Sequence, residues 1–276
     1  MRVFSPIHLG KYSLKLLLAF SIILTIQSSR ADSFSLVPVS PANDDPNWIL
    51  GPSKAPLGDF ATVRIPEGYR FTDAKGARTL LQRMKNPLPS GLVGLFAPDS
   101  GKWWVVLDAT DIGYLQGLNQ NVPLDAKTIL AGVRARLDLD NLRRSRQGGQ
   151  PIASIDWARP PAFDPSQKTL EWALRAETVV EGVVNLEQVS QTNPVVNRTI
   201  RLIGKSRVLG LTAVSAEGAA SEPTPMKELV KNVSFNPGQQ YADFKPGDKV
   251  ASWKLEQLIV GEEMPTQTPQ WVWITV

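Results

Sequence analysis

The stretch VVNRTIRLIGKSRVLGLTAVS, residues 195–215, holds two runs rich in β-branched and aliphatic residues with a short polar loop between them. Such runs are typical of strands, which predicts one strand over 195–203 and another over 207–215. Residues 152–157 and 169–176 repeat the pattern upstream, with Pro160-Pro161 and Asp164-Pro165 between them. Strands joined by short loops pair antiparallel, so the second half of the chain predicts an antiparallel sheet.

The first half mixes strands and helices. Alternation over 59–65 predicts a strand that turns at Pro66-Glu67-Gly68, and two more strands are predicted over 91–97 and 102–109. Three- and four-residue spacing predicts a helix over 72–85 behind a Thr72 cap, a long helix from Asp125 to the Gly148-Gly149 pair, and helices over 226–233 and 249–260. The expected fold class is α+β: a single domain with an antiparallel sheet and helices packed mainly on one face.

The N-terminal residues resemble an export signal. Residues 1–31 carry four basic side chains and no acidic one, and Leu16–Ile26 is an apolar stretch too short to span a membrane. Ser29 and Ala31 place small residues where a signal peptidase reads, so we expect residues 1–31 to be a cleaved signal peptide; a retained signal anchor is the alternative. Residues 32–50, rich in Pro, Ser, Asn and Asp, are expected to form an extended leader.

Charge and residue usage exclude several functions. Four of the 30 Lys and Arg residues lie in the signal segment, so the remainder holds 26 basic and 26 acidic residues, and nucleic-acid binding is rejected. The only His is His8, and there is no Cys. His- and Cys-based catalysis and the usual transition-metal sites are therefore excluded, and neither a cofactor nor a metal is expected; only an oxygen-liganded calcium site stays open.

A set of short motifs resembles one known family, the domain of unknown function 2167 family of uncharacterised membrane-anchored proteins. The motifs run in order over residues 51–261: Gly51-Pro52, Leu57-Gly58-Asp59, Pro66-Glu67-Gly68-Tyr69, Asn86, Gly113-Tyr114, Asp156-Trp157-Ala158, Pro160-Pro161, Trp172-Ala173, Arg201-Leu202-Ile203-Gly204, Phe235-x-Pro237-Gly238, Tyr241-Ala242-Asp243-Phe244 and Asp248-Lys249-Val250-Ala251. The resemblance implies an exported bacterial envelope domain with no established activity, periplasmic or otherwise associated with the envelope.

The sequence departs from that family at three places. Leu115–Asn119 stands where the family usually has an acidic stretch, and Ala162 stands where it often has His. The membrane segments that usually follow are replaced by a polar stretch and a tail, residues 262–276, whose Trp271 and Trp273 share one face of an extended segment. We expect this tail either to add a strand to the sheet or to contact a membrane surface or a partner.

Two groups of residues are candidates for ligand binding. Trp103 and Trp104 are adjacent on a strand, so one enters the core while the other is either covered or forms an aromatic platform. The segment from Tyr241 to Lys249 combines that tyrosine with Asp243 and Asp248, although Asp248 also suits the cap of the helix expected at 249.

An acidic cluster offers the chemical alternative. Asp156, Asp164 and Glu171 fall on one predicted hairpin and could supply general acid and base groups, although charged pairs across strands are common. Arg143, Arg144 and Arg146 are read as cations that complement the carbonyl end of their helix, with an anion site as the alternative. The chain is thus expected to be a non-catalytic binding or scaffolding module for an envelope protein or a glycan; the alternative is a carboxylate-dependent hydrolase acting on glycan.

Overall fold

The computed structural model describes residues 46–84, 86, 88–101, 103–146, 151–184, 187–216 and 224–261. These residues belong to one compact unit, which spans Phe34–Val276. The predicted signal peptide, residues 32–45 of the expected leader, and the C-terminal tail with Trp271 and Trp273 lie outside the described residues. Among the described helices, none has the length and apolarity needed to cross a membrane.

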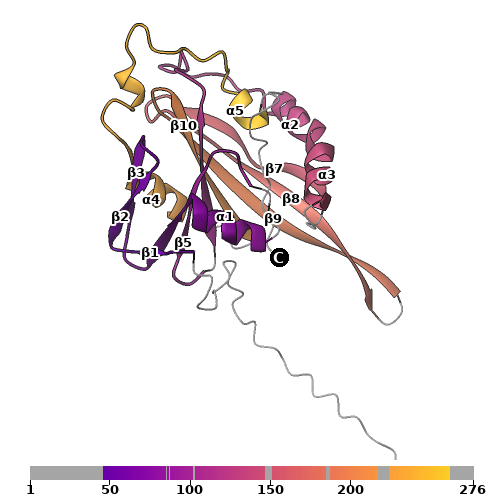
Figure 1. The fold of residues 1–276 in the computed structure, drawn as a ribbon. Coiled ribbons are helices and arrows are strands. Elements are labelled where there is room, and N and C mark those ends of the chain that lie inside the picture. The colour runs from indigo at the N-terminus through magenta and orange to yellow at the C-terminus, as the bar shows by residue number, and fades with distance from the viewer. Residues whose placement is uncertain are drawn as a thin grey trace, which may run out of the picture. The chain divides into compact units, whose positions relative to one another are not determined.

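An antiparallel sheet of eight strands is the main element of the fold (Figure 1). Its strands, in spatial order, are β1 (Ile49–Leu50), β4 (Tyr69–Asp73), β5 (Leu92–Pro98), β6 (Trp104–Asp111), β10 (Arg207–Ala216), β9 (Glu187–Ile203), β8 (Thr169–Val184) and β7 (Ile152–Asp164). Each neighbouring pair is antiparallel. The expectation of an antiparallel sheet is therefore confirmed.

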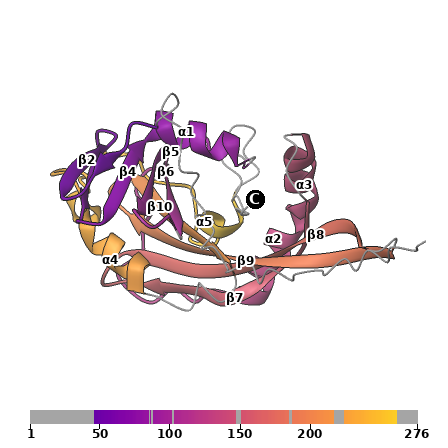
Figure 2. The same ribbon diagram turned by 90° about the horizontal axis from the view of Figure 1, so that it is seen from below.

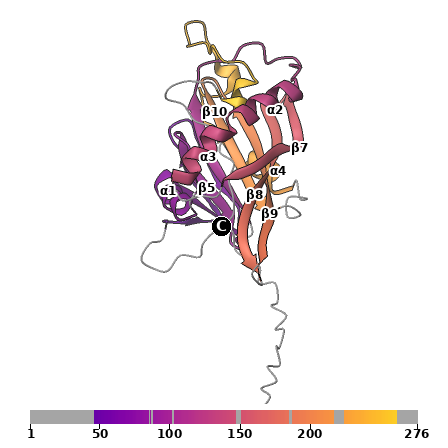
Figure 3. The same ribbon diagram turned by 90° about the vertical axis from the view of Figure 1, so that its right-hand side faces the viewer.

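Helices cover one face of this sheet in two places (Figure 2). The helix α1 (Ala74–Arg83) packs over β5 and β6 on a cluster that includes Leu80, Leu95 and Trp104. The helices α2 (Ala126–Ala135) and α5 (Gln257–Val260) pack over β7 and β8 on a second cluster around Trp172. Figure 3 shows α2 and α3 (Leu137–Arg146) lying in front of these strands.

The opposite face of the large sheet packs on a second, smaller sheet. This sheet has the order β11 (Val233–Phe235), β3 (Ala61–Ile65) and β2 (Ser53–Leu57), and the helix α4 (Thr224–Asn232) packs with it. Apolar side chains of β6, β9 and β10 point into this layer. The helices therefore lie mainly, but not all, on one face of the large sheet.

A buried ion pair lies on the helix-covered face of the sheet. Arg201 on β9 donates to Asp108 on β6 at 2.5 Å, and the two side chains are 12% and 9% exposed. Between them runs β10, where Gly210 pairs with both residues in the strand register. A Cβ at this glycine would lie 1.7 Å from the guanidinium of Arg201, so the absence of a side chain leaves room for the ion pair.

Several predicted element bounds are wrong. The helix expected at 72–85 spans Ala74–Arg83, and its cap is Asp73, which accepts from the amides of Lys75 and Gly76. Thr72 instead donates its hydroxyl hydrogen to the carbonyl of Pro46. The end of the expected leader is part of the fold, because Ile49–Leu50 pairs with β4.

The helical predictions also need correction further along the chain. The single helix expected from Asp125 is two helices, α2 and α3, which are separated at Arg136. The helix expected over 249–260 is reduced to Gln257–Val260. Strand β7 continues through Pro160 and Pro161, whereas these two prolines were expected to lie in a loop.

Candidate functional site

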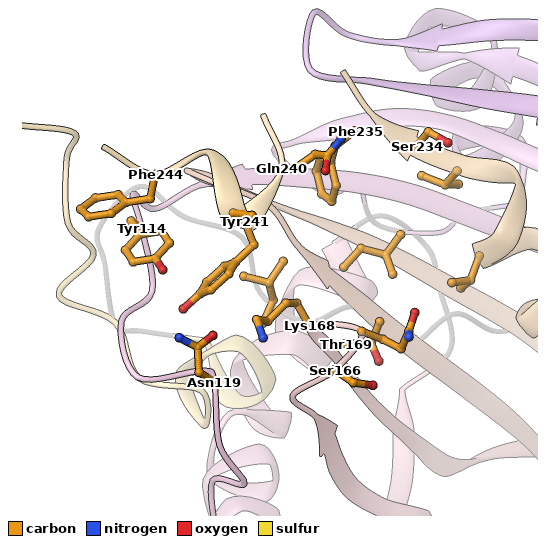
Figure 4. Close-up of a pocket in the computed structure, with 16 residues that line it drawn as sticks. Tyr114, Asn119, Ser166, Lys168, Thr169, Ser234, Phe235, Gln240, Tyr241 and Phe244 are labelled. Carbon is orange, nitrogen blue, oxygen red and sulfur yellow. The ribbon is translucent and has the colours of Figure 1, made fainter. Parts of the chain in front are cut away.

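A pocket of about 750 Å³ opens where three segments distant in sequence meet. Loop residues after β6, the turn between β7 and β8, and the segment from β11 through the short 3-10 helix η2 (Tyr241–Asp243) form its walls (Figure 4). Sixteen residues line it: Tyr114, Asn119, Ser166, Gln167, Lys168, Thr169, Leu202, Ile203, Val230, Val233, Ser234, Phe235, Gln240, Tyr241, Ala242 and Phe244.

Backbone hydrogen bonds fix the loop after β6 to the turn between β9 and β10 and to the chain after η2. Gly113 donates to the carbonyl of Ser206 at 3.0 Å, and Tyr114 exchanges hydrogen bonds with Lys249 and Ala251 at 2.8 and 2.9 Å. Gly113 has a φ of 86° and lies against this same backbone, where a Cβ would approach the carbonyl oxygen of Lys249 to 2.8 Å. The glycine is therefore needed both for its left-handed conformation and for the close contact.

Aromatic rings form a column along one side of the pocket. Tyr114 stacks on Phe244 with ring centroids 3.9 Å apart and on Tyr241 at 4.6 Å. The ammonium of Lys168 lies 5.2 Å from the centre of the Tyr241 ring, so the column ends in a cation–π contact. Figure 4 shows the Lys168 nitrogen on the side of the pocket where Tyr241 and Asn119 lie.

The phenol of Tyr241 is a fixed hydrogen-bond donor. It is buried and donates to the carbonyl of Leu115 at 2.7 Å. Burial, together with the neighbouring Tyr114, raises the pKa of Tyr241 above its usual range. The phenol therefore stays protonated over the physiological pH range and does not act as a base.

The two acids of the Tyr241 segment close turns instead of facing the pocket. Asp243 accepts from the backbone amide of Gln240 at 2.9 Å, and Asp248 accepts from that of Lys245 at 2.8 Å. The hydrogen bond from Lys245 and the ammonium of Lys205, 3.5 Å away, lower the pKa of Asp248. Asp248 therefore caps no helix at 249, and neither acid lines the pocket.

The other candidate acids each have a different partner. Asp156 accepts from Arg134 at 3.0 Å, and Glu171 accepts from Arg159 at 2.8 Å and also from Arg198. Asp164 accepts from the hydroxyl and amide of Ser166, and the hydroxyl is the main reason that the pKa of Asp164 is lowered. These three acids lie on the β7–β8 hairpin but do not converge on one position.

The candidate tryptophans lie in the core and its margin. Trp104 is completely buried beneath α1, which places it in the core rather than at a binding surface. Trp103 is half-buried on the opposite face, with ring centroids 6.0 Å from Tyr69 and 6.5 Å from Phe96. Neither residue lines the pocket. Of the sequence candidates, the pocket contains Tyr241.

Sequence reasoning missed Lys168, Asn119 and Gln240 as pocket residues. No periodicity or spacing connects these positions, since they lie on three separate segments. The family motifs could have indicated part of the pocket. Four motif residues line it: Tyr114, Phe235, Tyr241 and Phe244.

The family model described as a protein of unknown function, DUF2167, matches residues 49–268. The chain belongs to this DUF2167 family. No curated protein matches this DUF2167 chain. Membership confirms the family that the motifs indicated, and it adds no activity, because the family's own function is unknown.

Two solved structures are similar to this DUF2167 chain at low identity. The solution structure of cyanobacterial PsbP (CyanoP) from Synechocystis sp. PCC 6803 has 11% identity and a TM-score of 0.35, with 67% of this chain and 92% of that chain covered. The Saccharomyces cerevisiae Ran-binding protein Mog1p has 10% identity and a TM-score of 0.29, with coverages of 67% and 96%. At these TM-scores, neither likeness bears on function.

Among the described residues, no group of three or more acidic, His or Cys side chains is arranged to hold a metal ion. The pocket itself offers hydroxyls, amides, aromatic rings and one ammonium. This set of groups suits binding through hydrogen bonds and packing.

Proposed function

We propose that this DUF2167 chain is a non-catalytic binding module of the bacterial cell envelope, and that its pocket holds a segment of glycan. The observation that carries the proposal is the composition of the pocket: amides, hydroxyls and aromatic rings, with no carboxylate among its sixteen described lining residues. Its volume of about 750 Å³ lies within the range of small-molecule sites.

The polar groups suit sugar hydroxyls. The amides of Asn119, Gln167 and Gln240 each offer donors and an acceptor, and the hydroxyls of Ser166 and Thr169 can do either. Sugar hydroxyls also both donate and accept hydrogen bonds, so these amides and hydroxyls can accept from and donate to the same sugar. The apolar side chains on the pocket wall, Leu202, Ile203 and Phe235, can pack against the C–H face of a sugar ring.

The positions of the acids argue against the hydrolase alternative. Glycoside hydrolysis uses two carboxyl groups roughly 5 to 9.5 Å apart on either side of the scissile bond. Asp243 and Asp248 accept hydrogen bonds from turn amides, and Asp156 and Glu171 are paired with arginines. None of these described acids lines the pocket.

Location in the envelope rests on residues 1–31 and on the resemblance to an exported family. Mass spectrometry of the protein from its native host tests it: export with processing predicts a mature chain that begins at Asp32. A mature chain that still begins at Met1 would favour the signal-anchor alternative.

A glycan array followed by calorimetry with the purified full chain tests ligand binding. Asn119→Ala removes an exposed pocket amide, while Asn121→Ala changes an exposed amide of the same loop that does not line the pocket. We expect Asn119→Ala to weaken binding about threefold to tenfold, the effect of losing one net hydrogen bond of about 1 kcal/mol. Asn121→Ala should bind like the unmodified chain.

Two results would contradict this proposal. One is the release of new reducing ends from a bound glycan, which would show hydrolysis. The other is the absence of binding to any glycan on the array.

A further inference from the structure

Lys168 lines the pocket and has a backbone conformation that is unfavourable for lysine. It lies in the turn between β7 and β8 with a φ of 53°, in the left-handed region where glycine or asparagine is the less strained residue. Its carbonyl accepts from the amide of Ile203 at 3.0 Å, which fixes the turn against the end of β9. The lysine side chain is thus held over the pocket by a backbone that would suit another residue better.

The ammonium of Lys168 forms no close ion pair with a carboxylate among the described residues, although its charge contributes to the lowered pKa of Asp164 on the same turn. It donates to the carbonyl of Pro165 and lies over the Tyr241 ring, which leaves donor capacity for a ligand because an ammonium has three N–H groups. Asp164 on the same turn uses its carboxylate to accept from Ser166 and Gln167. Lys168 is also the one charged residue among the described residues that line the pocket.

From these observations we infer that the glycan held in the pocket carries a carboxylate, which binds Lys168; this rests on the proposed glycan-binding function. A half-buried cation that faces a cavity without an acid selects an anionic ligand. A single ammonium beside the neutral amide of Asn119 matches one negative charge. Phosphate sites more commonly combine arginines or the N-terminus of an α-helix, and neither is among the described residues that line this pocket.

The test compares two oligosaccharides of equal length, one made of uronic acid residues and one of the corresponding neutral sugar. Calorimetry with the full chain should show about tenfold tighter binding of the acidic probe, the size expected for one charge-assisted hydrogen bond. This preference should shrink as salt is added, because the site is open to solvent.

Lys168→Asn is the decisive variant, because asparagine tolerates the left-handed conformation and the turn should fold as well as before. We expect it to bind the acidic probe no more tightly than the neutral one, so that the preference for the acidic probe is lost. Lys127→Asn, which changes an exposed lysine of α2 outside the pocket, should keep the full preference.

Equal binding of both probes by the unmodified chain would overturn the inference while leaving glycan binding intact. Equal loss of both probes in Lys168→Asn would assign the lysine a structural role and would also overturn it. A sugar phosphate of the same size that binds more tightly than the uronic acid probe would replace carboxylate by phosphate. Absence of binding to either saccharide would instead count against the proposed function itself.

Discussion

Replacement of one partner of the buried Asp108–Arg201 pair should destabilise the fold strongly. In Arg201→Met the carboxylate of Asp108 would stay 9% exposed and would lose the guanidinium that lies 2.5 Å away. A buried charge left without its partner costs about 3–5 kcal/mol. For a folded unit of this size, about 1 kcal/mol shifts the melting temperature by about 2–4 °C, so we expect a fall of about 6–20 °C.

The double variant Asp108→Leu with Arg201→Met distinguishes two quantities: the cost of leaving one buried charge without its partner, and the net contribution of the ion pair to the free energy of unfolding. Replacing both charged groups by apolar ones is often neutral or stabilising, so most of the lost stability should return. The coupling free energy from the four proteins should then be about 2–3 kcal/mol or more.

Thermal and urea unfolding followed by circular dichroism measure these differences. Gly210→Ala provides an independent perturbation, because its Cβ would displace the guanidinium without changing either charge. It should be destabilising in the original chain and better tolerated when Arg201 is already Met. If Arg201→Met unfolds within about 1 kcal/mol of the original chain, the pair is effectively solvated and the reasoning is refuted.

Two further predictions concern single side chains. Arg144 is 1% exposed, its two terminal nitrogens have no hydrogen-bond partner, and burial lowers its pKa to about 10. Because this buried charge is poorly compensated, Arg144→Met should raise the melting temperature by about 2–4 °C. A fall in the melting temperature would show that the charge is needed. The raised pKa of Tyr241 means that above about pH 10 the unfolded chain loses this proton while the folded chain keeps it, so stability should decline with rising pH. Urea unfolding between pH 8 and 11 should show a shallower decline for Tyr241→Phe, and an unchanged slope would contradict the assignment.

The strands could be predicted because their signal is local. Alternating and β-branched runs placed the strands of the second half, and short loops indicated that they pair antiparallel. Extension of β7 through Pro160 and Pro161 could not be read from the sequence, because proline usually interrupts a strand. Here β7 is the edge strand and its register shifts between Arg159 and Ala162, so the missing amides leave no inner pairing unsatisfied.

Helix bounds failed where a local hydrogen bond competed with helix formation. Asp248 had the position of a cap, but its carboxylate binds the amide of Lys245, behind it in the chain, and no helix starts at 249. The arginines at the end of α3 were interpreted as cations that complement the carbonyl end of the helix, whereas Arg144 is buried. Burial of that kind depends on tertiary packing, which helical spacing does not reveal.

Prediction of the pocket failed for a different reason. Tyr241 was a candidate from its own segment, but its neighbours Tyr114 and Lys168 come from distant turns. Only the folded arrangement brings these residues together. The acids of the same segment were overestimated, because turn geometry engages both carboxylates.

The strand order of the large sheet has a consequence for the route of folding. Strands β4, β5 and β6 pair with near neighbours in sequence, and so do β7, β8, β9 and β10, whereas the junction of β6 with β10 joins residues about 100 positions apart, such as Leu107 and Leu211. Closure of so long a loop is slow, so we expect the two groups of strands to form before they join. The Asp108–Arg201 pair crosses that junction. Substitution of either residue of this pair should therefore mainly increase the unfolding rate, and the refolding rate should change little.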